Sequence, residues 1–207
     1  MQTLVRAINR ALLCVTGHWL ALVNAIMALI VGLALLAPWL ALHGQAGFSD
    51  VLYWLYRPLC HQLPERSFFI GGPSVAYTLQ QLEASLGHVP AGRFAGNAQL
   101  GYKMAFCERD VATYAGWLLF GLAFAVNRKR IRPLRWPWVI ALSVPMAVDG
   151  LLQLFGVAMS NPERRVITGL LFALATAWFA YPHVERGMEE AGMIARESLE
   201  GAHAADT

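Results

Sequence analysis

The chain has 207 residues, of which 57% are hydrophobic and 14% are charged. A typical soluble domain is about 45–50% apolar and about 25% charged, so this composition argues against a soluble globular enzyme, a disordered chain and a collagen-like fibre. The net charge of +3 comes from 16 Lys and Arg against 13 Asp and Glu, an excess too small to indicate a nucleic-acid partner. The composition predicts a polytopic membrane protein whose main partner is the lipid bilayer.

Four apolar stretches are candidates for crossing the bilayer. A spanning helix needs about 20 mostly apolar residues, and the stretches that meet or approach this length are residues 20–42, 111–126, 136–159 and 166–181. Trp and Tyr residues lie near the ends of these stretches, as is usual at membrane interfaces. We therefore expect an all-α fold, a four-span transmembrane helical bundle over residues 20–182.

The distribution of basic residues predicts the orientation of the spans. Residues 127–135 (NRKRIRPLR) contain five basic residues and no acid, and short loops rich in Lys and Arg are typical of the cytoplasmic side. Four spans then place both termini in the cytoplasm and residues 43–110 outside the cell membrane. Arg164 and Arg165, in the second outer loop, run against this rule.

The two ends of the chain are predicted to be helical outside the bilayer. Residues 1–19 carry apolar side chains at helical spacing together with two arginines, which is typical of a cytoplasmic interfacial helix. The apolar core that follows is too long for a cleaved signal peptide. The acidic tail 183–207 is expected to begin as a solvated helix and to fray after Gly201.

The long loop between the first two spans is predicted to be partly helical. Residues 49–60 (SDVLYWLYRPLC) fit a helix lying on the membrane, and residues 74–86 (SVAYTLQQLEASL) fit a second helix capped by Ser74. The stretch 87–101 is rich in Gly and Ala and is expected to be a loop. A re-entrant hairpin through the apolar residues 67–70 is an alternative for this region.

Thiol, imidazole and carboxylate groups lie at the two edges of this outer loop. Cys60 and His61 are adjacent, and Cys107 and Asp110 come just before the second span. Such groups suit zinc, iron or copper. The four residues therefore form a candidate site for zinc or another transition metal, although their spacing matches no standard zinc signature. Two alternatives stay open, namely a Cys60–Cys107 disulfide on an oxidising outer face, and inert buried thiols beside a packing histidine.

An acidic residue in the third span marks a second polar cluster. Asp149 and Gln153 share one helical face, and acids within a membrane usually face the protein interior or a water-filled cavity. Arg66 and Arg109 are expected on the same side of the bilayer and suit an anionic group. One interpretation is that these four residues line a cofactor-binding pocket. The other is that Asp149 pairs with an arginine and holds helices in register. The arginines available for such a pair are Arg109, Arg164 and Arg165.

Three stretches resemble a known family of predicted membrane proteins, domain of unknown function 2085. These stretches are CHQLPERSFFIGG, CERDVATYAG and VDGLLQLFGVAMSNPERRVITG, and the resemblance covers residues 52–72 and 100–172. It implies a shared polar site at the outer face and names no reaction. It also implies that many members carry Cys where this chain has Asp110, which makes softer metals less favoured here, and that residues 73–99 are inserted. The motif positions are occupied by Cys60, His61, Gln62, Arg66, Ser67, Cys107, Arg109, Asp110, Tyr114, Asp149, Gly150, Gln153, Gly156, Asn161, Arg165, Thr168 and Gly169.

The function predicted first is a multi-pass membrane protein with a metal-binding Cys/His/Asp site at the extracytoplasmic face. The alternative is a structural or accessory subunit of a larger membrane complex, since the chain is small and shows no catalytic triad, phosphate loop or dinucleotide motif. A thiol–disulfide oxidoreductase ranks third because the sequence has no Cys-x-x-Cys pair. On these features an enzyme is not expected.

Overall fold

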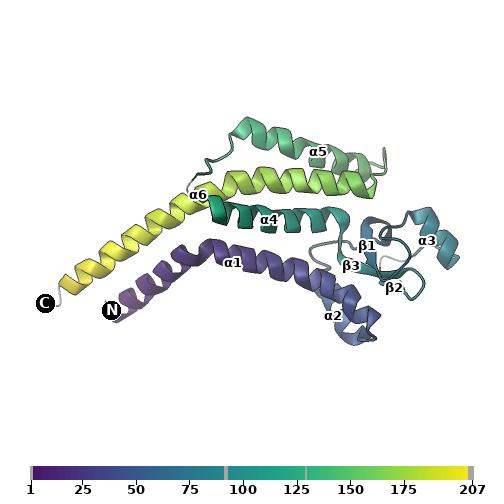
Figure 1. Cartoon of the computed structure of the whole chain (residues 1–207), viewed down its shortest axis with the longest axis horizontal. Helices are drawn as coiled ribbons and strands as arrows, with labels where there is room; N and C mark the ends of the chain where they lie inside the picture. The colour runs from purple at the N-terminus through teal and green to yellow at the C-terminus, as the bar shows by residue number, and fades with distance from the viewer. Residues whose placement is uncertain (1, 91–92, 129, 205–207) are drawn as a thin grey trace.

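Four long helices form a bundle that carries a small structured cap at one end (Figure 1). The computed structural model describes residues 2–90, 93–128 and 130–204. The long helices are α1 (Gln2–Leu42), α4 (Glu108–Asn127), α5 (Trp136–Leu154) and α6 (Pro162–Ala204). Each is long and apolar enough to cross a membrane. The prediction of an all-α, four-span transmembrane bundle is confirmed.

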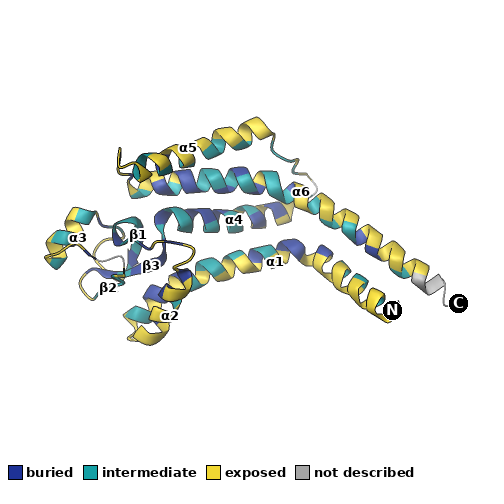
Figure 2. Cartoon of the chain, turned by 180° about the vertical axis from the view of Figure 1, so that it is seen from behind, coloured by how far each residue is buried: buried dark blue, intermediate teal, exposed yellow. Residues whose placement is uncertain are grey.

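Helix α6 is the central element of the bundle, because it contacts α1, α4 and α5. Small residues let α4 approach it closely. A Cβ added at Gly116 would lie 2.7 Å from the Cβ of Ala173, and one added at Gly169 would lie 2.8 Å from the carbonyl oxygen of Arg109. Small residues at helix interfaces are typical of membrane bundles, where packing rather than hydrophobic burial drives association. Figure 2 shows that α5 and the outer face of α1 are largely exposed, as expected of surfaces that meet lipid.

Helices α1 and α6 extend beyond α4 and α5 at the end that carries both termini (Figure 1). A helix of 41 residues is about 60 Å long, twice the thickness of the hydrocarbon layer. The helix predicted over residues 1–19 is therefore the first part of α1 and not an element of its own. The acidic tail continues α6 as far as Ala204, past the predicted fraying point at Gly201. Met1 and residues 205–207 lie outside the described residues.

Polar contacts connect these two extensions. The side-chain amide of Asn9 donates to Oγ of Ser198 at 2.8 Å, and Nε1 of Trp19 donates to Glu185 at 2.8 Å. Glu185 also pairs with Arg128, at the end of α4, over 2.7 Å. The acidic tail is thus a largely exposed helix, one side of which contacts α1.

The outer loop folds into the cap. It contains helix α2 (Ala46–Tyr56), the short 3-10 helix Pro64–Arg66 and helix α3 (Leu79–Leu86). It also forms an antiparallel sheet of strands β1 (Ser67–Ile70), β2 (Gly96–Asn97) and β3 (Gly101–Cys107), in the order β1-β3-β2. The two predicted loop helices are present, but both are shorter than expected.

Several helix and strand boundaries in and near the cap differ from those predicted from the sequence. Helix α3 begins later than predicted because Thr78, and not Ser74, is its N-cap, in a reciprocal capping box with Gln81. Residues 67–70 form β1 and not a re-entrant hairpin. Helix α5 ends at Leu154, five residues early, where Gly156 adopts a positive φ of 67° that a continuing helix does not allow. Residues 91–92 of the expected loop 87–101, and Lys129 of the basic loop, lie outside the described residues.

Candidate metal site

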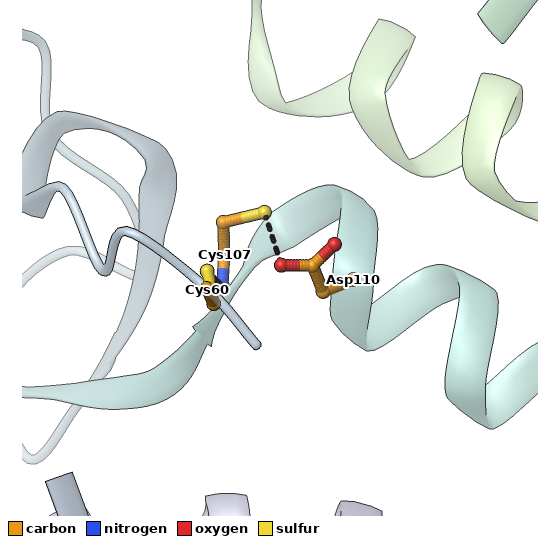
Figure 3. A group of neighbouring side chains, drawn as sticks. All are labelled: Cys60, Cys107 and Asp110. Atoms are coloured by element: carbon orange, nitrogen blue, oxygen red, sulfur yellow. Dashed lines mark hydrogen bonds between the residues drawn. The ribbon is translucent and has the colours of Figure 1, made fainter. Parts of the chain in front are cut away.

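Three of the four predicted metal ligands meet in the structure. The sulfurs of Cys60 and Cys107 and a carboxylate oxygen of Asp110 lie within 4.8 Å of one another (Figure 3). The thiol of Cys107 donates a hydrogen bond of 3.1 Å to Oδ2 of Asp110. Both cysteines are free, so the alternative of a Cys60–Cys107 disulfide is not the form seen in this structure.

The junction between β3 and α4 places two of these ligands. Cys107 is the last residue of β3 and the N-cap of α4, so Asp110 is the third residue of that helix. Residues three apart share one face of a helix, which brings both side chains to the same side. The β1–β3 ladder fixes the strand by pairing Ser67 with Cys107.

The loop after α2 places the third ligand, Cys60. The Cys60 amide donates to the carbonyl oxygen of Tyr56 at 3.0 Å, which continues the turn at the end of α2. The Tyr53 hydroxyl donates to the carbonyl oxygen of Lys103 at 2.5 Å and so ties α2 to β3. Cys60 is therefore held against the strand that carries Cys107.

Gln62 turns the chain sharply beside Cys60. It is the one non-glycine residue with positive φ (55°) in the described part of the chain, a conformation that costs energy and often marks functional loops. Its side-chain amide donates to the carbonyl oxygen of Tyr53 at 2.8 Å, and its carbonyl oxygen accepts a hydrogen bond from the Lys103 ammonium. Both contacts hold the turn in place.

This turn aims backbone donors at the Cys60 sulfur. The amide of Gln62 lies 3.5 Å from that sulfur, and the amide of Cys107 donates to it at 3.2 Å. Backbone N–H donors stabilise negative charge on an acceptor. The environment of Cys60 is therefore suited to a sulfur that carries charge, as a thiolate ligand does.

Asp110 is the one carboxylate of this cluster. The neighbouring Cys60 side chain and burial raise the pKa of the Cys107 thiol, in that order. Among the residues that the structure describes, no Lys or Arg forms an ion pair with Asp110. A metal ion bound here would supply positive charge and would remove the proton from a coordinating thiol. The donor set fits such an ion.

His61 is not in this group. Its side chain is exposed, and it lines a separate cavity of about 900 Å³ together with Arg57 and Lys103. Adjacency in sequence does not bring His61 to the cluster, since the side chains of neighbouring residues in a non-helical turn need not point to the same side. A role for His61 as a ligand stays a prediction.

The intramembrane acid has its own partners. Asp149 is buried and accepts hydrogen bonds from Arg109 and, at 2.9 Å, from the amide of Gln153. Arg164 lies 3.9 Å from the other carboxylate oxygen. These contacts favour the interpretation of Asp149 as an ion-pair partner that links α4, α5 and α6. Cofactor binding by Arg66, Arg109, Asp149 and Gln153 stays a prediction. Arg66 is half-buried in the 3-10 helix, and its Nε has no hydrogen-bond partner among the residues that the structure describes.

A second buried ion pair was not expected from the sequence. Arg165, named as a possible partner of Asp149, instead bonds to Glu108 at 2.9 Å, and both side chains are less than 5% exposed. Arg165 also donates to the carbonyl oxygen of Glu65 at 3.3 Å and so ties α6 to the cap. Glu108 stands between motif residues in CERD, and that position was the signal available for finding it.

Two comparisons identify the family. A family described as "Predicted membrane protein (DUF2085)" matches residues 98–179. An uncharacterized protein of Methanocaldococcus jannaschii is 32% identical over 156 residues, which cover 71% of this chain and 80% of that protein. The chain belongs to the DUF2085 family. No solved structure matches it.

The DUF2085 match confirms the resemblance drawn from the motifs and covers much of the polar end of the bundle. It includes Cys107, Asp110, Asp149 and Arg165, whereas Cys60 precedes it. The family description gives a membrane location and names no reaction.

Proposed function

We propose that this DUF2085 protein binds one transition-metal ion, of the zinc class, through Cys60, Cys107 and Asp110. The observation that carries the proposal is the convergence of two thiols and one carboxylate, from segments 47 residues apart, within 4.8 Å. Zinc takes cysteine sulfur and aspartate oxygen in tetrahedral sites. Three protein ligands leave one position of such an ion for a non-protein ligand.

The proposed site belongs to the extracytoplasmic face of the cell membrane. The cap lies at one end of the bundle, and both termini lie at the other (Figure 1). The basic residues of 127–135 follow α4 at the end away from the cap. Because short basic loops favour the cytoplasm, this arrangement supports cytoplasmic termini and an outward-facing metal site.

Metal analysis of the purified protein tests the proposal. The full chain is extracted in mild detergent without chelators, loaded with Zn²⁺, passed through a desalting column and analysed for bound zinc. We expect about one zinc per chain in the wild type, and at least a tenfold loss in Cys60→Ser and Cys107→Ser. His61→Ala is the matched control and should keep its zinc, because its side chain lies outside the cluster.

Cobalt substitution adds a spectroscopic readout. Thiolate ligation of Co²⁺ should give a sulfur-to-metal charge-transfer band that disappears in both serine variants and persists in His61→Ala. A wild-type protein that retains neither zinc nor cobalt, although it unfolds cooperatively, would overturn the proposal.

A second candidate function is thiol–disulfide exchange, favoured by the closeness of two free thiols. Closing a Cys60–Cys107 bond would release two protons and two electrons, which a disulfide of a partner protein would accept. Mass-spectrometric counting of free thiols separates the two functions. Wild-type protein that is isolated without metal, and whose two thiols are freed only by a reductant, would favour exchange over metal binding.

A further inference from the structure

A second cavity lies far from the cap, at the end of α4 where the basic loop begins. It has a volume of about 520 Å³ and opens between α4, α6 and the loop. Its walls are apolar and aromatic and include Phe120, Ala123, Leu174 and Trp178. An apolar groove between spanning helices is a surface that an acyl chain can occupy.

The aromatic side chains in this wall have already used their polar atoms inside the protein. Nε1 of Trp178 donates to the carbonyl oxygen of Arg132 at 3.0 Å, and the Tyr181 hydroxyl donates to the carbonyl oxygen of Trp117 at 2.9 Å. The amide of Leu134 donates to the carbonyl oxygen of Trp178 at 3.4 Å. The two Trp178 bonds fix the loop against α6, the Tyr181 bond joins α6 to α4, and the ring faces are left as apolar wall.

Two arginines add positive charge to the cavity lining. Arg130 and Arg132 both line it and are exposed. Neither forms an ion pair within the described residues, whereas their neighbour Arg128 is paired with Glu185 at 2.7 Å. The groove therefore combines an apolar wall with two cations that no carboxylate of the described residues neutralises.

We infer that this groove binds one anionic phospholipid, with an acyl chain against the wall and the phosphate between Arg130 and Arg132. The apolar wall suits the acyl chain of such a lipid, and the two arginines suit its negative head group. Basic residues next to a span attract anionic lipids, which are concentrated in the cytoplasmic leaflet. The inference is independent of the metal site at the opposite end.

Native mass spectrometry of the full chain in detergent tests this inference, with phosphatidylglycerol and phosphatidylcholine of identical chains as probes. The wild type should retain phosphatidylglycerol roughly tenfold more tightly than phosphatidylcholine, as expected for two arginines near a negative head group. Arg130→Gln/Arg132→Gln should lose this preference. Arg135→Gln is the matched control, because it removes a charge from the same loop outside the groove.

A pair of variants tests the groove itself. Ala123→Leu adds bulk to an exposed position in the groove wall, and Ala125→Leu adds the same bulk to an exposed position of the same helix outside it. Only Ala123→Leu should weaken retention of both lipids. Equal retention of the two lipids by the wild type, or an effect of Arg135→Gln as large as that of the double variant, would overturn the inference.

Discussion

Two polar clusters lie side by side at the capped end of the bundle, and they differ in how their charges are matched. In the ion-pair cluster each buried carboxylate meets an arginine, Asp149 with Arg109 and Glu108 with Arg165. In the thiol cluster, Asp110 and two cysteines meet one another, and no cation pairs with Asp110 in the described residues. In the first cluster every carboxylate has an arginine partner, which holds the helices together. In the second, Asp110 has no such partner within the described residues, and the metal ion that we propose would provide one.

Four consecutive residues, 107–110 (CERD), contribute side chains to both clusters. Successive residues of a helix are rotated by about 100°, so residues 107 and 110 face one way while 108 and 109 face others. Cys107 and Asp110 meet Cys60, Glu108 meets α6 and Arg109 meets α5. One helical turn thus separates the proposed metal ligands from the structural ion pairs, and substitutions within it can test each cluster alone.

Arg165→Met should have the largest effect on stability. Removing one partner of a buried ion pair costs about 3–5 kcal/mol, because the remaining charge is left buried without compensation. We expect the unfolding midpoint in detergent to fall by about 10 °C, measured by differential scanning fluorimetry. Arg165→Met/Glu108→Gln should recover part of the loss. A midpoint equal to that of the wild type in the single variant would show that this pair does not hold the bundle together.

The next largest effect is a pH dependence of stability that arises from Lys103. This side chain is buried, with 1% of its surface exposed. Burial lowers its pKa from 10.5 to about 8 in the folded protein. The unfolded chain therefore binds this proton more tightly, and the free energy of unfolding should rise between pH 8 and pH 10.5, by at most about 3 kcal/mol. Below pH 8 the ammonium is charged in both states, so its penalty is constant there.

Denaturant unfolding of wild type and Lys103→Met across this pH window checks the effect. The difference in unfolding free energy between the two proteins should grow in favour of the wild type as pH rises from 8 to 10.5. A difference that stays constant over this range would contradict the buried ammonium. The result bears on the thiol cluster because the Lys103 ammonium donates to the carbonyl oxygen of Gln62, the residue that turns the chain beside Cys60.

A matched pair of acid-to-amide substitutions tests the comparison directly. Asp149→Asn should lower stability by about 1–3 kcal/mol by weakening a buried charged hydrogen bond, and should leave the zinc content unchanged. Asp110→Asn should lower zinc content at least tenfold and leave the stability of the metal-free protein nearly unchanged. Zinc analysis and thermal unfolding of both variants provide the two readouts. The opposite pattern would show that the roles of the clusters are reversed.

The smallest predicted effect is that of Gln62→Ala, which removes the amide contact with Tyr53 and keeps the positive φ. Residues that orient metal ligands typically change affinity 10–100-fold, and we expect about a tenfold loss of zinc affinity in a chelator competition titration. Gln62→Gly removes the same contact and also relieves the strain of a positive φ, which glycine adopts freely. Wild-type affinity in both variants would show that the turn does not position Cys60.

The four spans could be predicted because composition alone determines them. A helix that crosses lipid must be apolar over about 20 residues, and no comparable constraint sets the ends of helices. Sequence therefore did not show that the first span is continuous with the helix predicted before it, and that Gly17 does not interrupt this helix. Strand β3 was missed because Met104, Ala105 and Phe106 are all buried, which hides the alternation that usually reveals a strand.

The candidate site was predicted in its residue types and only partly in its members. Cys60, Cys107 and Asp110 come together, whereas His61 faces another cavity. The pairing of Arg165 with Glu108 depends on the rotation of α6 about its own axis relative to α4, which no short motif encodes. Whether the protein is an accessory subunit of a larger complex stays a prediction, for which copurified partners are the measurement.

Strand β3 passes into helix α4 without a single linking residue, since Cys107 ends one and Glu108 starts the other. A movement of the strand is therefore passed directly to the helix, because no linking residue lies between them. An ion bound between Cys60 and Cys107 would link the loop after α2 to the first residues of α4. Withdrawing that ion with a chelator would free the Cys60 loop to move, while the contacts of Arg165 with Glu65 and Glu108 would still hold the cap against the helices.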